Sequence, residues 1–187
     1  MIKIAILASH NGSNLEPIYE AIQANRLDAS ISLVISNNTD ANVLKKAQKL
    51  ALQSHLINAK TVSDPDQSIY DLCLENEIDM IVLSGYMKKL SSSLTRGFKI
   101  INSHPSLLPK YGGSGMYGRF VHEAVIANNE TKSGVSIHFV NEAYDEGEII
   151  LQKEILLTEN ETPSSLETRI KELEKQAIVE ALETCLR

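Results

Sequence analysis

Short β-branched runs alternate with amphipathic stretches through the first half of the chain, and this alternation limits the possible folds more than any other feature. The runs that we predict as strands cover residues 2–8, 31–35, 55–57, 80–83 and 99–101. Between them, residues 13–23 and 41–50 carry apolar side chains at helical spacing, and Asp64-Pro65 opens a third helix with a capping aspartate and a first-turn proline. The alternation predicts a doubly wound α/β fold, in which helices cover both faces of a mostly parallel sheet.

The pattern changes after residue 102. A glycine-rich loop at residues 111–116 precedes a predicted helix near 120–127. Two further strands, predicted at residues 134–140 and 148–157, are joined by a short turn region and should therefore be antiparallel. Thr162-Pro163 opens a last long helix. We expect a single domain, residues 1–187, with a Rossmann-like half at 1–101 and a second half at 102–187.

Composition narrows the class of protein. The chain has 187 residues, which suits one domain with a full core. A net charge of -6 argues against nucleic acid as a partner, because that needs a clustered basic face. The apolar N-terminal run is too short to span a membrane and shows no signal-peptide pattern, and the two cysteines lie far apart. We therefore expect a cytoplasmic protein with no membrane partner, either a monomer or a homodimer.

The loop after the first strand has two interpretations. Gly12, Ser13 and Asn14 lie at a strand-to-helix turn, where backbone N–H groups and the helix dipole favour an anion such as a phosphate monoester. Alternatively, Ser13 and Glu16 form a capping box at a plain helix start. Gly12 favours the phosphate site because it lets the backbone approach a ligand closely. A dinucleotide fingerprint needs three glycines, and this loop has one.

Asn102 and His104 follow the predicted strand 99–101 and precede a proline-bounded loop. A carboxamide can bind a carbonyl oxygen, and an imidazole can move a proton near neutral pH. Asp145, in a later turn, can approach His104 if their strands are neighbours, and it would then raise the pKa of the imidazole. The plainer alternative is a strand exit with a surface histidine. The spacing of the five histidines predicts no metal site.

Several motifs together resemble the folate-dependent formyltransferases. They are Asn11-Gly-Ser-Asn-Leu15, Ser84-Gly-Tyr-Met87, Asn102-Ser-His-Pro-Ser-Leu-Leu-Pro109, Gly134-Val-Ser-Ile-His-Phe139 and Asp145-Glu-Gly147. The resemblance covers nearly the whole chain. The Gly-Ser-Asn motif and the short length favour the glycinamide ribonucleotide branch of that family.

The resemblance implies the formyltransferase fold and a reaction of purine biosynthesis. A formyl group would pass from 10-formyltetrahydrofolate, a cosubstrate, to the amine of 5'-phosphoribosylglycinamide, without a metal. The implied catalytic residues are Asn102, His104 and Asp145, with His138 in support. The implied phosphate site is Gly12, Ser13 and Asn14 in the first half. The implied folate contacts are Tyr86, Met87, Lys88, Leu90 and Tyr144, Glu174 would contact the other substrate, and the Leu108–Pro109 bond would be cis.

Three features depart from the family pattern. Lys88-Lys89 stands where many relatives have arginine and an apolar residue, the loop 112–119 is longer and richer in glycine, and Glu174-Lys175-Gln176 lacks a Glu-His pair. Three other functions stay open from the residues alone. They are a 10-formyltetrahydrofolate hydrolase, a nicotinamide-dependent oxidoreductase and a non-catalytic phosphate- or nucleotide-binding module.

Overall fold

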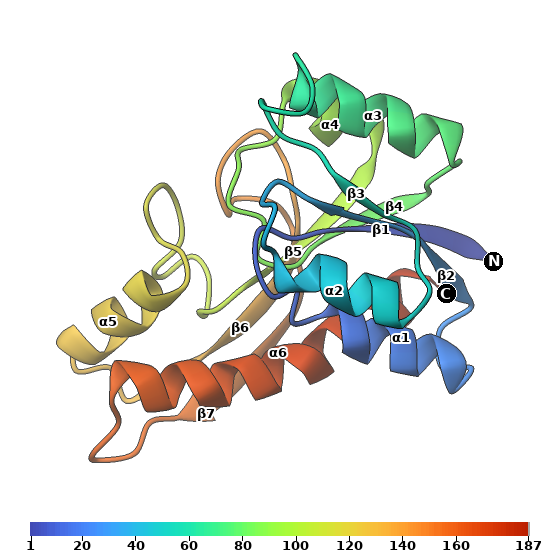
Figure 1. Ribbon diagram of the computed structural model, residues 1–187. Coiled ribbons are helices and arrows are strands. Elements are labelled where there is room, and N and C mark those ends of the chain that lie inside the picture. The colour runs from blue at the N-terminus through green and yellow to red at the C-terminus, as the bar shows by residue number, and fades with distance from the viewer. Residues whose placement is uncertain (187) are drawn as a thin grey trace. The chain divides into compact units, whose positions relative to one another are not determined.

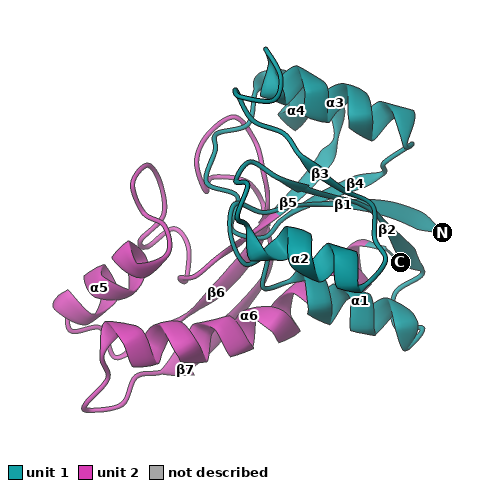
Figure 2. Cartoon of the chain, viewed as in Figure 1, with its two compact units in different colours: residues 1–101, 186 teal, residues 102–185, 187 magenta. Residues whose placement is uncertain are grey.

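The computed structural model describes residues 1–186, and it divides them into two compact units (Figure 2). Unit 1 is Met1–Ile101 with Leu186, and unit 2 is Asn102–Cys185. The sheet has seven strands in the order β3-β2-β1-β4-β5-β6-β7. The boundary between the units falls inside β5 (Lys99–His104).

Unit 1 is built from parallel strands and the helices that connect them. Its strands are β1 (Ile2–Leu7), β2 (Ala29–Ser36), β3 (Ser54–Leu56) and β4 (Met80–Leu83), and β1 pairs in parallel with both β2 and β4. The helices are α1 (Leu15–Gln23), α2 (Asn42–Lys49), α3 (Pro65–Glu75) and α4 (Ser92–Gly97). Figure 1 shows α1 and α2 on one face of these strands and α3 and α4 on the other. This arrangement follows from right-handed crossovers, because the chain reverses its direction across the sheet after β3.

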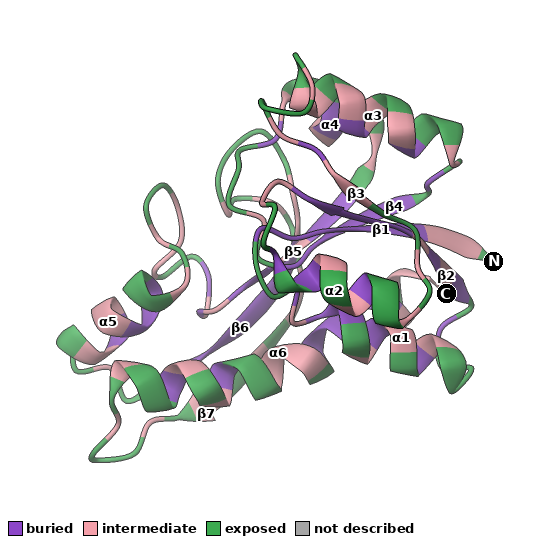
Figure 3. Cartoon of the chain, in the orientation of Figure 1, coloured by how far each residue is buried: buried purple, intermediate pink, exposed green. Residues whose placement is uncertain are grey.

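The strands of unit 1 are buried on both faces. Figure 3 shows β1, β2 and β4 as almost wholly buried, and Ile4, Ile6, Leu33 and Ile81 have no exposed surface. Helices on both faces explain why these strands read as continuous apolar runs rather than as alternating ones. The doubly wound α/β fold that the sequence predicts is confirmed.

Unit 2 combines an antiparallel pair with two helices. The elements are α5 (Arg119–Ala127), β6 (Lys132–Phe139), β7 (Ile149–Leu156) and α6 (Pro163–Cys185). β6 and β7 are antiparallel, as expected. α6 packs on α5, β6 and β7, and its Leu166 and Ile170 share a core with Val121 and Val125 of α5.

Helix starts show where local sequence signals succeed and fail. The Asp64 side chain accepts a hydrogen bond from the Gln67 N–H at 3.0 Å, so the predicted cap of α3 is confirmed. The predicted start of α1 at Ser13 is wrong. The helix begins at Leu15 after Asn14, and the Asn14 side chain makes no capping hydrogen bond, so the predicted Ser13–Glu16 box does not start this helix.

Two further features complete the fold. α4 was not predicted, because its six residues carry no apolar stripe, and Ser91 caps it. The Leu108–Pro109 peptide bond is cis, as the resemblance implied. Across residues 1–186, every helix is too short or too polar to cross a membrane.

Candidate active site

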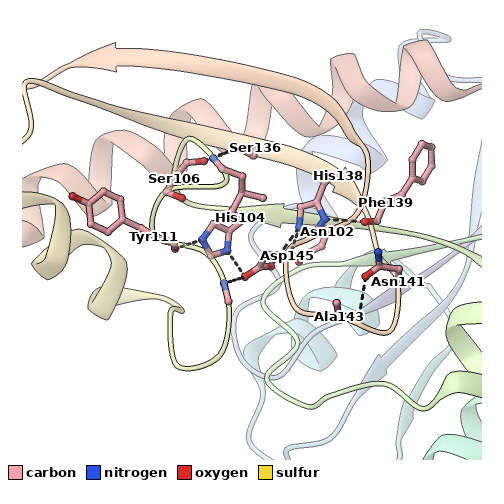
Figure 4. Close-up of polar contacts among 12 residues, drawn as sticks. Asn102, His104, Ser106, Tyr111, Ser136, His138, Phe139, Asn141, Ala143 and Asp145 are labelled. Atoms are coloured by element: carbon pink, nitrogen blue, oxygen red, sulfur yellow. Dashed lines mark hydrogen bonds and ion pairs between the residues drawn. The ribbon is translucent and has the colours of Figure 1, made fainter.

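Asn102 and His104 stand on the same face of β5, since side chains two residues apart on a strand point the same way. Figure 4 shows both side chains directed toward Asp145 and His138. The His104 side chain is almost fully buried, and Asn102 is half-buried. We call Asn102, His104, His138 and Asp145 the histidine cluster. All four belong to unit 2.

Asp145 lies between the two histidines of this cluster. Its Oδ2 is 3.5 Å from His104 Nδ1, and its Oδ1 is 3.5 Å from His138 Nε2. The Gly113 N–H donates to Asp145 Oδ2 at 3.0 Å, so the glycine-rich loop holds the carboxylate from a third direction. Asp145 itself has a φ of 56°, a left-handed conformation that a short polar side chain tolerates in a tight turn. The expected approach of Asp145 to His104 is therefore what the structure shows.

His138 orients the Asn102 carboxamide. The His138 Nδ1–H donates to the Phe139 carbonyl at 2.9 Å, because a carbonyl can only accept. In the neutral ring, Nε2 is then an acceptor, and Asn102 Nδ2 lies 3.2 Å from it. One Nδ2–H of Asn102 is thereby engaged, and the other remains for a further acceptor.

The pKa of His104 corrects the expectation from the sequence. Burial lowers the pKa of its imidazole below the ordinary value, although the Asp145 carboxylate and the Tyr111 carbonyl both act to raise it. The predicted increase is wrong because desolvation of the buried ring outweighs the nearby carboxylate. His104 is thus a mostly neutral imidazole at neutral pH.

Asp145 remains ionised in these surroundings. Burial raises the pKa of its carboxyl group, but attraction to His138 and His104 in their protonated forms, together with the Gly113 N–H, lowers it below the ordinary value. A neutral imidazole beside a charged carboxylate is the arrangement of a base that can accept a proton and hold it as an ion pair.

The second ring nitrogen of His104 is fixed by a group that the sequence did not indicate. Nε2 donates to the Tyr111 carbonyl at 2.7 Å. This bond defines the neutral tautomer, in which Nε2 carries the hydrogen and Nδ1 is unprotonated. A backbone carbonyl leaves no side-chain signal in a sequence, so only its position in the loop after the Asn-x-His motif could have suggested it.

In unit 1, a separate polar cluster gathers at the carboxyl ends of β1, β2 and β4. Ser9 Oγ donates to Asn37 Oδ1 at 2.6 Å and accepts from the Met87 N–H at 2.7 Å. The Ser9 carbonyl accepts from Asn38 Nδ2 at 2.6 Å, and the Ser9 N–H donates to the Gly85 carbonyl at 3.0 Å. We call these five residues the Ser9 cluster. Ser9 is fully buried, and nothing in the sequence distinguishes it from the other polar residues of the loop after β1.

The predicted phosphate residues adjoin that cluster. Gly12 has a φ of 56°, and a Cβ atom placed on it would lie 2.4 Å from Val43 Cγ2. Packing against α2 therefore requires this glycine whether or not a ligand binds. The Asn14 N–H donates to Ser84 Oγ at 3.0 Å, and the Ser13 side chain is half-buried.

The remaining predicted residues differ in exposure. Tyr86 is half-buried, and burial, with a smaller effect of Asp66, raises the pKa of its phenol to about 12. Met87 and Lys88 are exposed and Leu90 is buried, all in unit 1. In unit 2, Tyr144 is exposed and Glu174 is half-buried on α6. Within residues 1–186, no three His, Cys, Asp or Glu side chains form a group that could hold a metal ion.

Comparison with known proteins places the chain among enzymes. A family model described as formyl transferase matches residues 2–182. The chain is 38% identical over 181 residues to the phosphoribosylglycinamide formyltransferase of Haemophilus influenzae, with 94% of this chain and 83% of that protein covered. It is 35% identical to the chloroplastic phosphoribosylglycinamide formyltransferase of Vigna unguiculata, with 97% of this chain covered, and it spans only 60% of that longer protein.

Solved structures agree with the sequence comparison. The phosphoribosylglycinamide formyltransferase of Coxiella burnetii matches with a TM-score of 0.89 and 36% identity, over 99% of this chain and 87% of that one. The glycinamide ribonucleotide transformylase 1 of Symbiobacterium toebii matches with a TM-score of 0.91 and 28% identity, over 98% of this chain and 86% of that one.

Proposed function

The chain belongs to the formyl transferase family, and we propose that it transfers a formyl group from 10-formyltetrahydrofolate to the amine of 5'-phosphoribosylglycinamide. The observation that carries the proposal is the histidine cluster. It joins a carboxamide, a neutral imidazole and an ionised carboxylate in a buried part of unit 2. The names of the relatives support this choice of substrates.

The first step is attack of the substrate amine on the formyl carbon. A carbon–nitrogen bond forms, and the formyl oxygen becomes an oxyanion. The second Nδ2–H of Asn102 would donate to that oxygen, and His138 would hold the carboxamide in the required orientation. A preorganised donor of this kind contributes about 3 kcal/mol to the stability of the transition state.

The second step moves the proton. The attacking nitrogen carries one hydrogen too many after the bond forms, and His104 Nδ1 is the ring nitrogen able to accept it, because Nε2 is bonded to the Tyr111 carbonyl. Asp145 would stabilise the resulting imidazolium. The same proton would then pass to the folate nitrogen as its bond to the formyl carbon breaks. The imidazole returns to its neutral form.

Residues outside the histidine cluster would bind the two substrates. In unit 1, Gly12, Ser13 and Asn14 would hold the substrate phosphate, and Tyr86, Met87, Lys88 and Leu90 would contact the folate. In unit 2, Tyr144 would also contact the folate, and Glu174 the ribose or glycinamide end. These contacts are inferred from the family motifs. We further propose a cytoplasmic monomer or homodimer that acts on small molecules alone, without nucleic acid or membrane partners.

A coupled assay tests the function. The purified protein is mixed with 10-formyltetrahydrofolate, with or without glycinamide ribonucleotide, and the absorbance of the folate product is followed. The proposal predicts product only when the amine is present, in equal amount to the formylated acceptor. Folate product without the amine would establish a hydrolase instead. If the protein binds the ligands without turning them over, it is a non-catalytic binding module.

A further inference from the structure

The position of the His104 ring depends on a loop that leads away from the histidine cluster. Its Nε2–H donates to the Tyr111 carbonyl at 2.7 Å, and this bond is the shortest one that the ring makes. A movement of the Tyr111 carbonyl would turn the imidazole and remove Nδ1 from its position opposite Asp145. Whatever fixes Tyr111 therefore also fixes the base.

Tyr111 has a backbone conformation that needs support. Its φ is 57°, in the left-handed region that a bulky side chain disfavours. Its ring packs against the core that α5 and α6 share. Its hydroxyl donates to Glu130 Oε1 at 2.9 Å. The side chain is thus held at both the ring and the hydroxyl.

Glu130 receives a second donor from the same loop. Lys110 Nζ donates to the same Oε1 at 2.8 Å, so consecutive residues of the loop converge on one carboxylate oxygen. Glu130 lies between α5 and β6, and its side chain is 22% exposed, against 68% for Lys110. Hydrogen bonds from Lys110 and then from Tyr111 lower the pKa of the Glu130 carboxyl group, so it stays ionised as an acceptor.

We propose that Glu130 is a positioning residue for His104, and that it acts by fixing Tyr111, whose carbonyl sets the tautomer and orientation of the imidazole. This proposal rests on the proposed function, because it assigns Glu130 a role through the base of that reaction. Glu130 is outside the motifs that carry the family resemblance. Its contribution is visible only through the chain of contacts from Glu130 to Tyr111 to His104.

The structure supplies a matched control for this role. A cavity of about 400 Å³ is lined by Lys110, Tyr111 and Glu130 and also by Lys132 and Glu154. Glu154 Oε2 is bonded to Lys132 Nζ at 2.6 Å, which gives a second lysine–glutamate pair on the same cavity. An exposed ion pair of this kind contributes little to the stability of the fold. Loss of Glu154 removes a carboxylate from the same surroundings without touching the support of Tyr111.

The test compares Glu130→Ala, Glu130→Gln, Tyr111→Phe and the control Glu154→Ala in the formyl transfer assay. We expect Glu130→Ala to lower kcat by about three- to tenfold, the value of one lost hydrogen bond, with the KM of both substrates nearly unchanged. Tyr111→Phe should give the same loss, and the double variant no more than either single one, because both break one contact. Glu130→Gln should recover part of kcat, since its amide oxygen can still accept from the hydroxyl, and Glu154→Ala should match the wild type.

The pH profile of kcat separates positioning from a general loss of structure. His104 faces the Asp145 carboxylate, the Tyr111 carbonyl and the His138 ring, and a charge on His104 lowers the pKa of His122 on α5. The Tyr111 carbonyl is one of the groups that raise the pKa of His104. When it is released, the acidic limb of the profile should move to lower pH in Glu130→Ala and stay in place in Glu154→Ala.

Three outcomes would overturn the proposal. They are an equal kcat for Glu130→Ala and Glu154→Ala, losses that add in the double variant, and losses that appear only in KM. If Glu130→Ala does not fold, as judged by circular dichroism, Tyr111→Phe and Glu130→Gln decide the question alone. Absence of formyl transfer in the wild type would instead refute the proposed function, and full turnover in His104→Ala would refute the role of His104 as the base. An inactive His104→Ala together with a normal Glu130→Ala would refute only the positioning role.

Discussion

The Ser9 cluster and the histidine cluster both form where strands end, yet they use polar side chains in opposite ways. The Ser9 cluster joins neutral groups, and each hydrogen bond of the buried Ser9 ties one loop of unit 1 to another. The histidine cluster places an ionised carboxylate between two imidazoles, and burial lowers the pKa of His104. The hydrogen bonds of the Ser9 cluster fix the positions of loops, whereas the histidine cluster contains groups that can exchange a proton. A strand end alone therefore does not indicate chemistry, whereas opposed titratable groups do.

The largest expected difference between the two clusters concerns turnover. Asp145→Ala should lower kcat by about 10²–10⁴-fold, because the imidazolium formed in the reaction loses its counter-charge. Steady-state rates measured beside a thermal melt would show the effect. If the variant folds and keeps more than a tenth of kcat, the histidine cluster is a structural arrangement like the Ser9 cluster.

The second prediction concerns stability in unit 1. Gly12→Ala should lower the free energy of unfolding by about 2–4 kcal/mol, since the added Cβ meets Val43 in a left-handed backbone. Gly85→Ala is the control, because φ there is 70° but the added Cβ meets no atom of residues 1–186 within 4 Å. Urea denaturation of both variants measures the difference. Equal losses would mean that backbone strain, not packing on α2, explains Gly12.

The third prediction tests whether the loop beside the Ser9 cluster binds phosphate. Ser13→Ala should raise the KM for glycinamide ribonucleotide by about three- to tenfold, the value of one lost hydrogen bond, and should leave kcat nearly unchanged. The exposed Ser114→Ala is a suitable control in unit 2. An unchanged KM would assign this loop a packing role only.

The smallest effect is the pH dependence of stability. Because burial lowers the pKa of His104 in the folded state, the unfolded chain binds the proton more readily, and the free energy of unfolding should fall as pH drops below about 6.5. His122 adds to this fall for the same reason, since burial lowers its pKa too. Asp145, whose pKa is lowered, keeps its stabilising effect until far more acidic pH.

Urea titrations at pH 7 and pH 5 measure this slope. His104→Asn should flatten it, and the exposed His10→Asn controls for the removal of one histidine. A slope that is the same in wild type and His104→Asn would mean that His104 is not held in its neutral form.

Much of the fold was predictable because its signals are local. The alternation of apolar runs and helical stripes indicated the parallel strands and their helices, and Asp64 with Pro65 marked the start of α3. The start of α1 was predicted wrongly because Ser13 and Glu16 match a capping box, while the N–H of the actual N-cap residue, Asn14, bonds to Ser84 just after β4. Tertiary contacts of that kind leave no periodic pattern in the sequence.

The site was predictable only in part. Asn102, His104 and Asp145 could be found as chemical groups, and the structure brings them together in unit 2. The direction of the His104 pKa could not be found, because burial depends on packing from several elements. Sequence reasoning also missed three groups of the two clusters, namely the Tyr111 carbonyl, the Gly113 N–H and the buried Ser9. Every residue except proline has a backbone N–H and a carbonyl, and serines are common, so the sequence does not mark which of them takes part.

A single-turnover measurement with His104→Ala tests the central claim most directly. With the enzyme in excess over one substrate and both substrates fully bound before the reaction, the formyl transfer step itself is observed, so changes in binding and product release do not contribute. The account predicts a rate constant about 10²–10⁴-fold below that of the wild type in a protein with an intact fold. A rate constant close to that of the wild type would contradict it.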